Sequence, residues 1–364
     1  MYNLAQAGFT SDEVRKILSN NRSVSYGYDL LDKNENTIGS VHAFDCTISN
    51  NADAKIQRVA SMQIMEAKDI DFIYDRIRPY MQVEADRRKL IYPLGVFLLS
   101  SPSRKAQGGG IARTIDCYDK TQILSDDKFD TRYTVTAGTS YTGAVEGIID
   151  SAGITNMLID ASALQAQVDI EFPIGTSKLD ACNSLLEAIN YVPLYADSYG
   201  YIRSSRYILP EGRPIDAYYI TDKESIVCPG AEEELDVFNA PNKIVRYLEN
   251  AERGVLISSA TNNDPNSKLS TVSRGRTIVD IAAVDDVPNQ ATLDAMVERI
   301  MAERKIYQKV IIETLNMPNH EYSDCIYINN SEINVSGKYI ETAWDMDLRT
   351  GGKMRHILKK AVSL

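Results

Sequence analysis

The sequence predicts an α+β protein built mainly from antiparallel strands, and two observations carry this prediction. Residues 1–130 and 213–364 contain short apolar runs that alternate with polar residues and are bounded by turn-forming residues, as antiparallel strands are. Residues 131–212 change to the three-and-four spacing of amphipathic helices. A length of 364 residues is also typical of two to three domains. We therefore expect a β-rich domain with an N-terminal helix, a small α+β insert, and a second β-rich domain.

The first domain is expected to begin with a short helix and to continue as strands. In TSDEVRKIL, Thr10 and Glu13 have the spacing of a capping box, and Val14 and Leu18 share one helical face. The runs SVSYGYDLLD, IGSVHAFDCTISN, KIQRVASMQIM and IARTIDCYDK then have the composition of strands.

A long two-stranded ribbon is expected between Asp75 and Arg104. The segment DRIRPYMQVEADRRKLIYPLGVFLLSSPSR contains one long strand, a charged turn from Glu84 to Lys89, and a second apolar strand that is entered through YPLGVF. The glycine triplet at Gly108–Gly110 precedes a strand-like run. Because a phosphate-binding loop leads into a helix, this triplet is expected to be a hairpin turn or flexible tip.

The insert is expected to contain two helices and a hairpin. SYTGAVEGIIDSAG has one apolar face and ends at Gly153, and GTSKLDACNSLLEAINYV begins after a plausible N-cap at Ser177. Two short strands follow around the turn-forming sequence DSYG.

The last domain returns to strands. The charge run AEEELD is expected to be a solvated face or a loop. NKIVRYLE and RGVLISSAT form a predicted hairpin, a long helix covers 290–307, and KVIIETLNM is a strand. The closing ETAWDMDLRTGGKMRH is a predicted hairpin whose apolar face carries Trp344, Met346 and Leu348.

Composition argues against several classes of function. A net charge of −11 disfavours specific nucleic-acid binding, which needs basic patches. No secretory signal is expected from the first residues, and no apolar run is long enough to span a membrane. It carries no cofactor motif, and a metal site is not expected, because the cysteines and histidines are few and dispersed: Cys46, Cys117, Cys182, Cys228, Cys325, His42, His320 and His356.

The search for catalytic residues gives only weak candidates. HEYSDC, which begins with His320 and Glu321, resembles half of a zinc-protease motif but lacks the second histidine, so a turn between strands is expected. Asp197 stands near Tyr199 and Tyr201, and a carboxylate beside aromatic rings is typical of sugar sites. A polar turn with packed tyrosines is the alternative. No catalytic residue is therefore predicted.

The order of these segments resembles bacteriophage tail hub proteins over nearly the whole chain. DRIRPYMQVE, LIYPLGVFLLSSPSR and ARTIDCYDKTQIL look like their first barrel, where a ribbon precedes a PLGxF strand. FPIGTSKLDACNSLLEAINYVPLYADSYGYIR is similar to their middle unit. FNAPNKIVRYLEN, the long helix and ETAWDMDLRTGGKMRH resemble their second barrel.

This resemblance implies two tail-tube-like β-barrel domains, at 1–130 and 213–364, around the α+β insert. It further implies a homotrimer whose six barrels join a six-fold tail tube to a three-fold tail tip around a channel for DNA. Implied partners are the tail tube or distal tail protein, the tape measure protein, and a tail-tip spike or fibre protein. The implied location is the tip of a virion or phage-like particle, after synthesis in the host bacterial cytoplasm. An acidic channel would repel DNA phosphates, and no wall-degrading domain is expected after the second barrel.

In such a ring, the ribbon is expected to contact the neighbouring subunit along the edge of its sheet. The residues predicted to make this contact are Arg76, Arg78, Tyr80, Arg87 and Arg88. Ordinary solvated strand residues are the alternative interpretation. For the whole chain, the alternatives are a distal-tail or receptor-binding module that contacts host saccharide, and a cell-wall hydrolase that uses Asp197 and Glu321.

Overall fold

The structure is a computed structural model that describes residues 4–20, 22–66, 70–100, 102–107, 110–222, 225–235, 238, 240–250, 254–304 and 308–360. The first segment contains α1 (Ser11–Ser19), β1 (Ser23–Leu31), β2 (Thr37–Ser40), β3 (Ala43–Asn51), β4 (Arg58–Met65), β5 (Arg76–Ala85), β6 (Arg88–Pro93), β7 (Phe97–Leu99), β8 (Ser103–Gln107) and β9 (Gly110–Asp119).

The middle and last segments follow in chain order. The middle segment contains α2 (Thr121–Asp126), β10 (Tyr133–Val135), α3 (Tyr141–Ser151), β11 (Met157–Ile159), β12 (Ile170–Phe172), α4 (Lys178–Ala188), β13 (Tyr195–Ala196), β14 (Ile202–Ser204) and the 3₁₀ turn Pro210–Gly212. The last segment contains β15 (Ala217–Ile220), β16 (Glu232–Leu235), β17 (Lys243–Asn250), β18 (Gly254–Thr261), α5 (Thr271–Arg274), β19 (Val279–Ala283), α6 (Gln290–Arg304), β20 (Gln308–Leu315), β21 (Cys325–Asn330), β22 (Val335–Asp347) and β23 (Lys353–Lys360).

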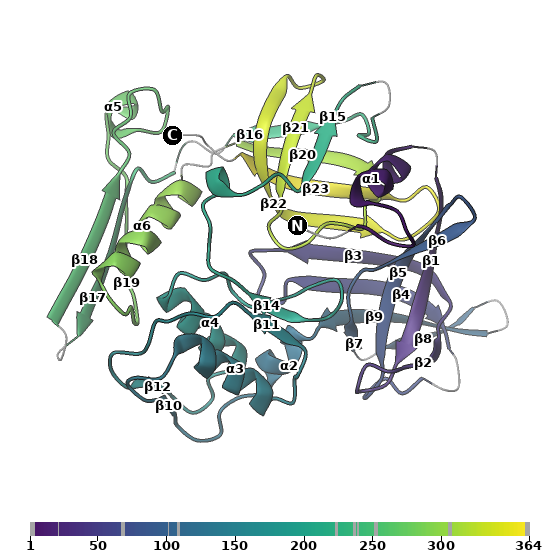
Figure 1. Cartoon of the computed structure of the whole chain (residues 1–364), viewed down its shortest axis with the longest axis horizontal. Helices are drawn as coiled ribbons and strands as arrows, with labels where there is room; N and C mark the ends of the chain where they lie inside the picture. The colour runs from purple at the N-terminus through teal and green to yellow at the C-terminus, as the bar shows by residue number, and fades with distance from the viewer. Residues whose placement is uncertain are drawn as a thin grey trace.

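Strands of the first and last segments form one 15-stranded sheet (Figure 1). Its main path runs β16-β20-β23-β22-β3-β4-β9-β7-β5-β1-β2, with β15, β21, β6 and β8 paired beside it. Antiparallel pairing of β22 with β3, from Ala343↔Asn51 to Asp347↔Thr47, joins the two segments. The prediction of a mainly antiparallel α+β fold is confirmed. The two predicted barrels are not confirmed, because the pairing closes no barrel among the described strands.

The sheet contains two blocks of four strands with the same plan. The first block has the order β3-β4-β9-β8, and the second block has the order β16-β20-β23-β22. Every neighbouring pair in both blocks is antiparallel. Each block ends in a hairpin, β8–β9 or β22–β23, formed by the last two strands of its segment. The order and pairing of four strands therefore recur within one sheet of one chain.

The two segments also share one hydrophobic core. Trp344 and Met346 from β22 pack in the same cluster as Ile48 from β3 and Met62 from β4. The predicted apolar face of the closing hairpin is confirmed, since Trp344, Met346 and Leu348 are all buried. Burial of side chains from both segments in one cluster stabilises the junction between β22 and β3.

The ribbon differs from its prediction in one respect. β5 and β6 are joined by a two-residue turn at Asp86 and Arg87, which have φ values of 47° and 61°, as a tight hairpin turn requires. The run YPLGVF is not one strand, because the chain leaves β6 and returns as β7 on the same edge of β5. Gly95 makes this break possible: its φ is +137°, and a Cβ there would lie 2.7 Å from the Phe97 ring.

IGSVHAFDCTISN likewise forms two strands and not one. β2 pairs with β1, whereas β3 pairs with β4 and β22 at a distant place in the sheet. The capping box of Thr10 and Glu13 is confirmed at the start of α1. β8 pairs with β9 up to Gln107↔Gly110, and residues 108 and 109 of the predicted turn lie outside the described residues.

The middle segment folds around its own core. The predicted helices are α3 and α4, and Ser177 caps α4 by accepting a hydrogen bond from the backbone N–H of Asp180. The hairpin of β13 and β14 is confirmed. At its turn, Gly200 has a φ of +83°, and a Cβ there would lie 2.7 Å from the Val96 side chain. This turn therefore packs directly on the first segment.

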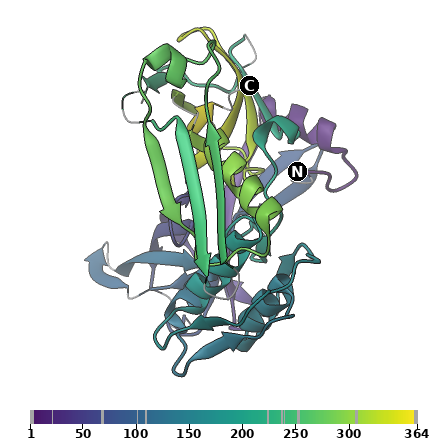
Figure 2. The same cartoon turned by 90° about the vertical axis from the view of Figure 1, so that its left-hand side faces the viewer.

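A separate three-stranded sheet, ordered β18-β17-β19, extends from the last segment (Figure 2). The hairpin predicted from NKIVRYLE and RGVLISSAT is the pair β17–β18. The long helix is α6, which buries Leu293, Met296 and Val297, and residues 305–307 of its predicted range lie outside the described residues. Within the run AEEELD, Glu232–Leu235 form the exposed strand β16, whereas Ala231 precedes the strand and is partly buried; residue 236 is not described.

Candidate functional site

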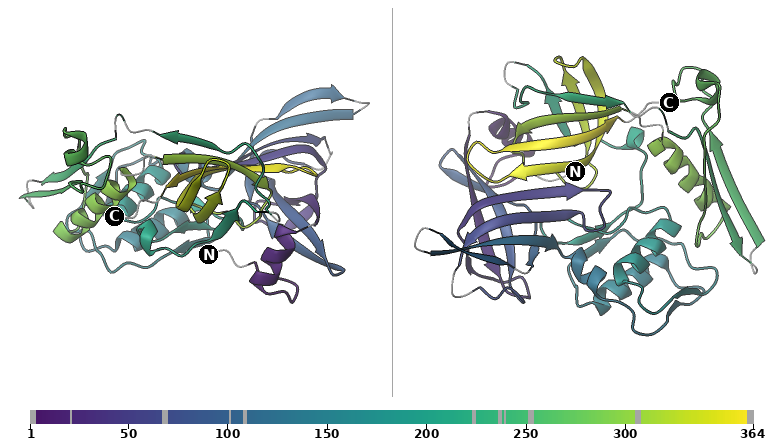
Figure 3. Two further views of the ribbon diagram at one scale, coloured as in Figure 1. Left: turned by 90° about the horizontal axis from the view of Figure 1, so that it is seen from above. Right: turned by 180° about the vertical axis from the view of Figure 1, so that it is seen from behind.

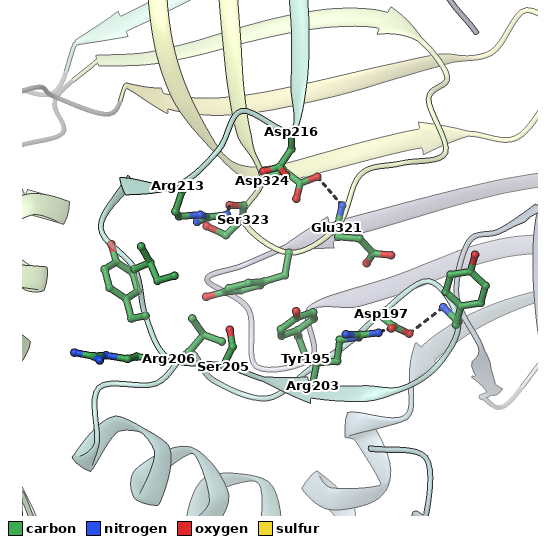
Figure 4. A pocket seen from close by; sticks show the side chains of 15 residues that line it. Tyr195, Asp197, Arg203, Ser205, Arg206, Arg213, Asp216, Glu321, Ser323 and Asp324 are labelled. Atoms are coloured by element: carbon green, nitrogen blue, oxygen red, sulfur yellow. Dashed lines mark hydrogen bonds and ion pairs between the residues drawn. The ribbon is translucent and has the colours of Figure 1, made fainter. Parts of the chain in front are cut away.

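A pocket of about 500 Å³ lies between the β13–β14 hairpin and the loop that joins β20 to β21 (Figure 4). Tyr195 from β13 and Tyr322 from the loop stack at its centre, with ring centroids 4.7 Å apart. Charged groups of both signs surround them: Asp197, Arg203, Arg206, Arg213, Asp216, Glu321 and Asp324. Sequence reasoning did not identify the two stacked tyrosines, because 127 positions separate them.

Glu321 holds three parts of the chain together at this pocket. Its carboxylate forms a 2.6 Å ion pair with Arg58 of β4, and the Arg58 side chain is only 1% exposed. Its other oxygen accepts a hydrogen bond from the backbone N–H of Ser198 in the middle segment. Arg58 also donates to the carbonyl of Leu94 and lies 5.4 Å from the centre of the Trp344 ring. The Glu321 carboxylate therefore connects the first, middle and last segments through one ion pair and one hydrogen bond.

Both carboxylate oxygens of Asp197 also accept hydrogen bonds from nearby groups of the same hairpin. One carboxylate oxygen accepts hydrogen bonds from the backbone N–H groups of Tyr199 and Tyr201, both at 2.9 Å. The other oxygen accepts from Nε of Arg203 at 2.5 Å. These bonds shape the DSYG turn and fix Arg203 beside the pocket.

The structure thus brings the two sequence-predicted carboxylates, Asp197 and Glu321, into one pocket. Each already accepts hydrogen bonds from protein donors on both of its oxygens. Tyr199 lines the pocket and is half exposed, whereas Tyr201 does not line it. Glycoside hydrolysis needs one carboxyl group free to protonate the leaving group and one free to attack or to activate water. The observed contacts favour a structural junction.

A second ionic cluster fixes the base of the ribbon. Glu35 pairs with Arg76 of β5 at 2.7 Å and with Lys120 at 2.6 Å, and it accepts a hydrogen bond from Asn156 of the middle segment. Burial lowers the pKa of Lys120, although Glu35 opposes this shift. The cluster ties the ribbon to both the first and the middle segments.

The other predicted ribbon residues have the following contacts. Arg78 pairs with Asp29 at 2.6 Å, and Arg88 donates to the carbonyl of Ala7 and stacks on the Phe9 ring. Arg87 is exposed at the turn, and Tyr80 is partly buried. Arg76, Arg78 and Arg88 therefore have partners inside their own chain, and their predicted contact with a neighbouring subunit remains a prediction.

A buried polar cluster lies in the second block and was not predicted. Glu341 of β22 is 1% exposed and accepts hydrogen bonds from Nδ1 of His320 at 2.6 Å and Nδ1 of His356 at 2.5 Å. The Nε2 atoms face Tyr219 Oη at 2.6 Å and Thr314 Oγ1 at 2.8 Å. One glutamate therefore satisfies two buried histidines, each held on its far side by a hydroxyl group.

His320, Glu341 and His356 place three potential metal-ligand atoms within 4.8 Å of one another. Zinc ligands stand about 2.0–2.2 Å from the ion in a tetrahedral arrangement, which separates neighbouring ligand atoms by about 3.3 Å. The observed N–O separations of 2.5 and 2.6 Å are hydrogen-bond lengths instead. The cluster is accordingly a hydrogen-bond network.

The charges of this network depend on its burial. Burial disfavours the Glu341 carboxylate, but the two histidines outweigh burial and lower its pKa to about 2. Burial also disfavours charged His320, but Glu341 outweighs burial and raises the pKa of His320. For His356 burial dominates and lowers the pKa. Burial raises the pKa of the neighbouring Asp324 carboxyl to about 7.

These shifts predict that Asp324 lowers the free energy of unfolding as pH rises from about 4 to about 7, and that His320 lowers it further as pH rises above 6.5. Folded Asp324 keeps its proton to about pH 7, whereas the unfolded group loses it near 3.8, and folded His320 likewise holds a proton above its ordinary pKa of 6.5. Each proton retained only by the folded state contributes a slope of about 1.4 kcal/mol per pH unit. Urea unfolding at several pH values measures this slope. Asp324→Asn should flatten the slope below about pH 7, and an unchanged slope there in this variant would contradict the assignment.

The cysteines are free thiols, and four of them are buried: Cys46, Cys117, Cys182 and Cys325. Among the helices that the structure describes, none has the length and apolar character needed to cross a membrane.

Comparison with known proteins shows the fold. No protein-family description and no curated protein matches the sequence. The structure is similar to the tail protein from Neisseria meningitidis MC58 (TM-score 0.65, 12% identity, 92% of this chain and 97% of that chain). It is also similar to the prophage MuSo2 43 kDa tail protein from Shewanella oneidensis (TM-score 0.63, 11% identity, 92% and 98%). A third similar structure is prophage tail protein gp18 from Listeria monocytogenes EGD-e (TM-score 0.57, 12% identity, 93% and 95%).

The chain therefore has the fold of phage and prophage tail proteins. The predicted resemblance to tail proteins is confirmed at the level of the fold, which extends over more than nine tenths of this chain and of each of these three.

Proposed function

We propose that this chain is a structural hub in the tail of a phage or a phage-like particle and that it catalyses no reaction. The observation that carries this proposal is the repeat of one four-strand block within a fold shared with three tail proteins. Because each chain has two similar halves, a ring of three copies presents six similar halves. A trimer with barrel-like halves would then join a six-fold tail tube to a three-fold tip.

The proposed partners follow from this position in the tail. One side of the ring contacts the tail tube or distal tail protein, the other contacts a spike or fibre protein, and the tape measure protein ends inside the ring. The net charge of −11 supports a channel that DNA passes without binding. The engaged carboxylates of Asp197 and Glu321 support a role without catalysis.

Immunogold labelling of intact particles from the strain that encodes this chain tests the proposal. We expect gold only at the end of the tail that is distal to the capsid. The control is to shear the tails from the capsids before labelling. The free capsids should then carry no gold. Particles without label, with the chain left free in the lysate, would contradict the structural role.

A further inference from the structure

A groove of about 650 Å³ lies between α1 and β15, which stand side by side in Figure 1 and in the view from above in Figure 3. Its volume is within the range of pockets that bind ligands, about 300–1,000 Å³. Every residue of β15 lines the groove, including those whose side chains point to opposite faces of the strand. The groove therefore follows the edge of β15. The opposite wall is one face of α1 and carries Asp12, Arg15, Lys16 and Ser19.

The edge of β15 that faces away from β21 has no partner strand among the described residues. Directly after β15, Thr221 donates its backbone N–H to the carbonyl of Asn329 at the end of β21. Because the backbone groups of successive strand residues alternate in direction, those of Tyr218 and Ile220 point away from β21. The N–H and C=O groups of these two residues are therefore available to another chain.

The first segment shows how the chain itself covers such an edge. β1 precedes the first block as β15 precedes the second block, and one edge of β1 pairs with β5. The four-residue strand β2 covers the other edge of β1 in antiparallel pairing. β15 also has four residues, but no described strand takes the place of β2 beside it. A short extended segment is therefore the element that this edge lacks.

The groove also contains polar groups that lack partners. Asn319 lines it and is 6% exposed, and its Oδ1 atom accepts no hydrogen bond from the described part of the chain. A buried acceptor without a donor is unfavourable, and a backbone N–H of an incoming segment would supply the donor. On the α1 wall, Arg15 is paired with Asp12 at 2.7 Å. Lys16 is exposed and forms no ion pair with the residues that the structure describes, so an acidic side chain in the incoming segment would complement it.

Exposed apolar side chains flank the free edge. Tyr218 and Ile220 lie two residues apart, on the same face of β15, and are 62% and 40% exposed. Aromatic and β-branched side chains stabilise a neighbouring strand through cross-strand pairs. A strand added at this edge would therefore cover both side chains with its own alternate residues.

From these observations we infer that the free edge of β15 receives an extended peptide segment of another protein, which adds as a strand in the groove beside α1. The segment alternates apolar side chains, which cover Tyr218 and Ile220, with polar side chains that include an acidic residue for Lys16. Strand addition takes its affinity from main-chain hydrogen bonds and its specificity from alternate side chains. The inference rests on the proposed function for the class of partner, which is another protein of the tail.

A library of random displayed peptides of about eight residues tests the groove, because such peptides exceed the roughly 13 Å length of β15. Selection on the full chain should enrich peptides that alternate apolar and polar residues and carry an acidic residue. In a synthetic copy of a selected peptide, N-methylation of one alternate set of backbone amides should abolish binding. N-methylation of the other set should leave binding intact, since only one edge of an added strand faces β15. Fluorescence anisotropy measures both, and equal effects of the two sets, or the absence of any enriched peptide, overturn the inference.

Variants of the chain locate the contact. Tyr218→Pro removes an outward N–H, a change that an edge strand tolerates, whereas Tyr218→Ala removes only the ring. The proline variant should bind the peptide roughly 3- to 10-fold more weakly than the alanine variant. Lys16→Glu should weaken binding by roughly 5-fold, and the control Lys33→Glu, at an exposed position outside the groove, should not. Circular dichroism verifies that each variant is folded, and the N-methylated peptides decide the question even where Tyr218→Pro does not fold.

Two other results would also overturn the inference. Peptide binding that none of these variants weakens would place the peptide elsewhere on the chain. Self-association in sedimentation equilibrium that Tyr218→Pro abolishes would make a second copy the occupant of the groove. Gold at the tail end without peptide binding would reject the groove and retain the hub function. Peptide binding by a chain that is absent from particles would reject the hub function and retain the groove, so the two failures are distinguishable.

Discussion

Glu341→Ala is expected to lower the free energy of unfolding by roughly 2–6 kcal/mol, because it leaves two buried imidazole donors without an acceptor at about 1–3 kcal/mol each. His320 and His356 both donate to this carboxylate, and all three side chains are at most 1% exposed. Urea unfolding followed by circular dichroism measures the loss.

Two further variants separate hydrogen bonding from the removal of a charged group in general. Glu341→Gln keeps one acceptor oxygen and should lose less stability than Glu341→Ala. Glu313→Ala removes a glutamate from β20, which is separated from β22 by β23 in the same sheet. Glu313 pairs there with Lys353 at 2.6 Å with 40% of its side chain exposed. That surface pair should contribute only about 0–1 kcal/mol. Equal losses from Glu341→Ala and Glu313→Ala would contradict the importance of the buried network.

Sequence reasoning succeeded where the deciding interaction is local. The cap of α1 at Thr10, the cap of α4 at Ser177 and the turn at Gly200 depend on hydrogen bonds or backbone angles within a few residues. The alternation that buries Trp344 and Met346 is equally visible in the sequence, because side chains along a strand repeat with a period of two. Elements of this kind are specified by neighbours along the chain.

Contacts between segments that are distant in the chain could not be predicted from a single sequence. The Arg58–Glu321 pair spans 263 positions, and no local pattern indicates that its two members meet. Pairing of β22 with β3 depends on edges that become adjacent only after both segments have folded. A partial signal did exist for the buried network: Glu341 and His356 interrupt otherwise strand-like apolar runs, YIETAW and MRHIL. A charged or titratable residue on the buried face of a strand requires a partner, and this requirement could have linked them.

The second large effect is expected for Arg58→Met, which should lower the free energy of unfolding by about 3–5 kcal/mol because it leaves a partly buried carboxylate without its cation. Methionine fills most of the space beside Trp344 and so limits the contribution of lost packing. The remaining loss comes from Glu321, whose side chain is 17% exposed, and from the Leu94 carbonyl, which loses a donor. Chemical denaturation measures the change.

A double-mutant cycle distinguishes the ion pair from every other role of Arg58. In Arg58→Met/Glu321→Gln neither partner is charged, and the glutamine oxygen can still accept from the backbone N–H of Ser198. The double variant should therefore recover part of the stability that Arg58→Met loses. Replacing both members of a buried ion pair costs less folding free energy than leaving one member charged and unpaired. The matched control is Arg132→Met, whose pair with Glu171 has a similar length of 2.8 Å but 68% and 53% exposure, and it should lose at most about 1 kcal/mol. Strictly additive losses would mean that Arg58 stabilises the three segments by packing, and that its ion pair with Glu321 does not.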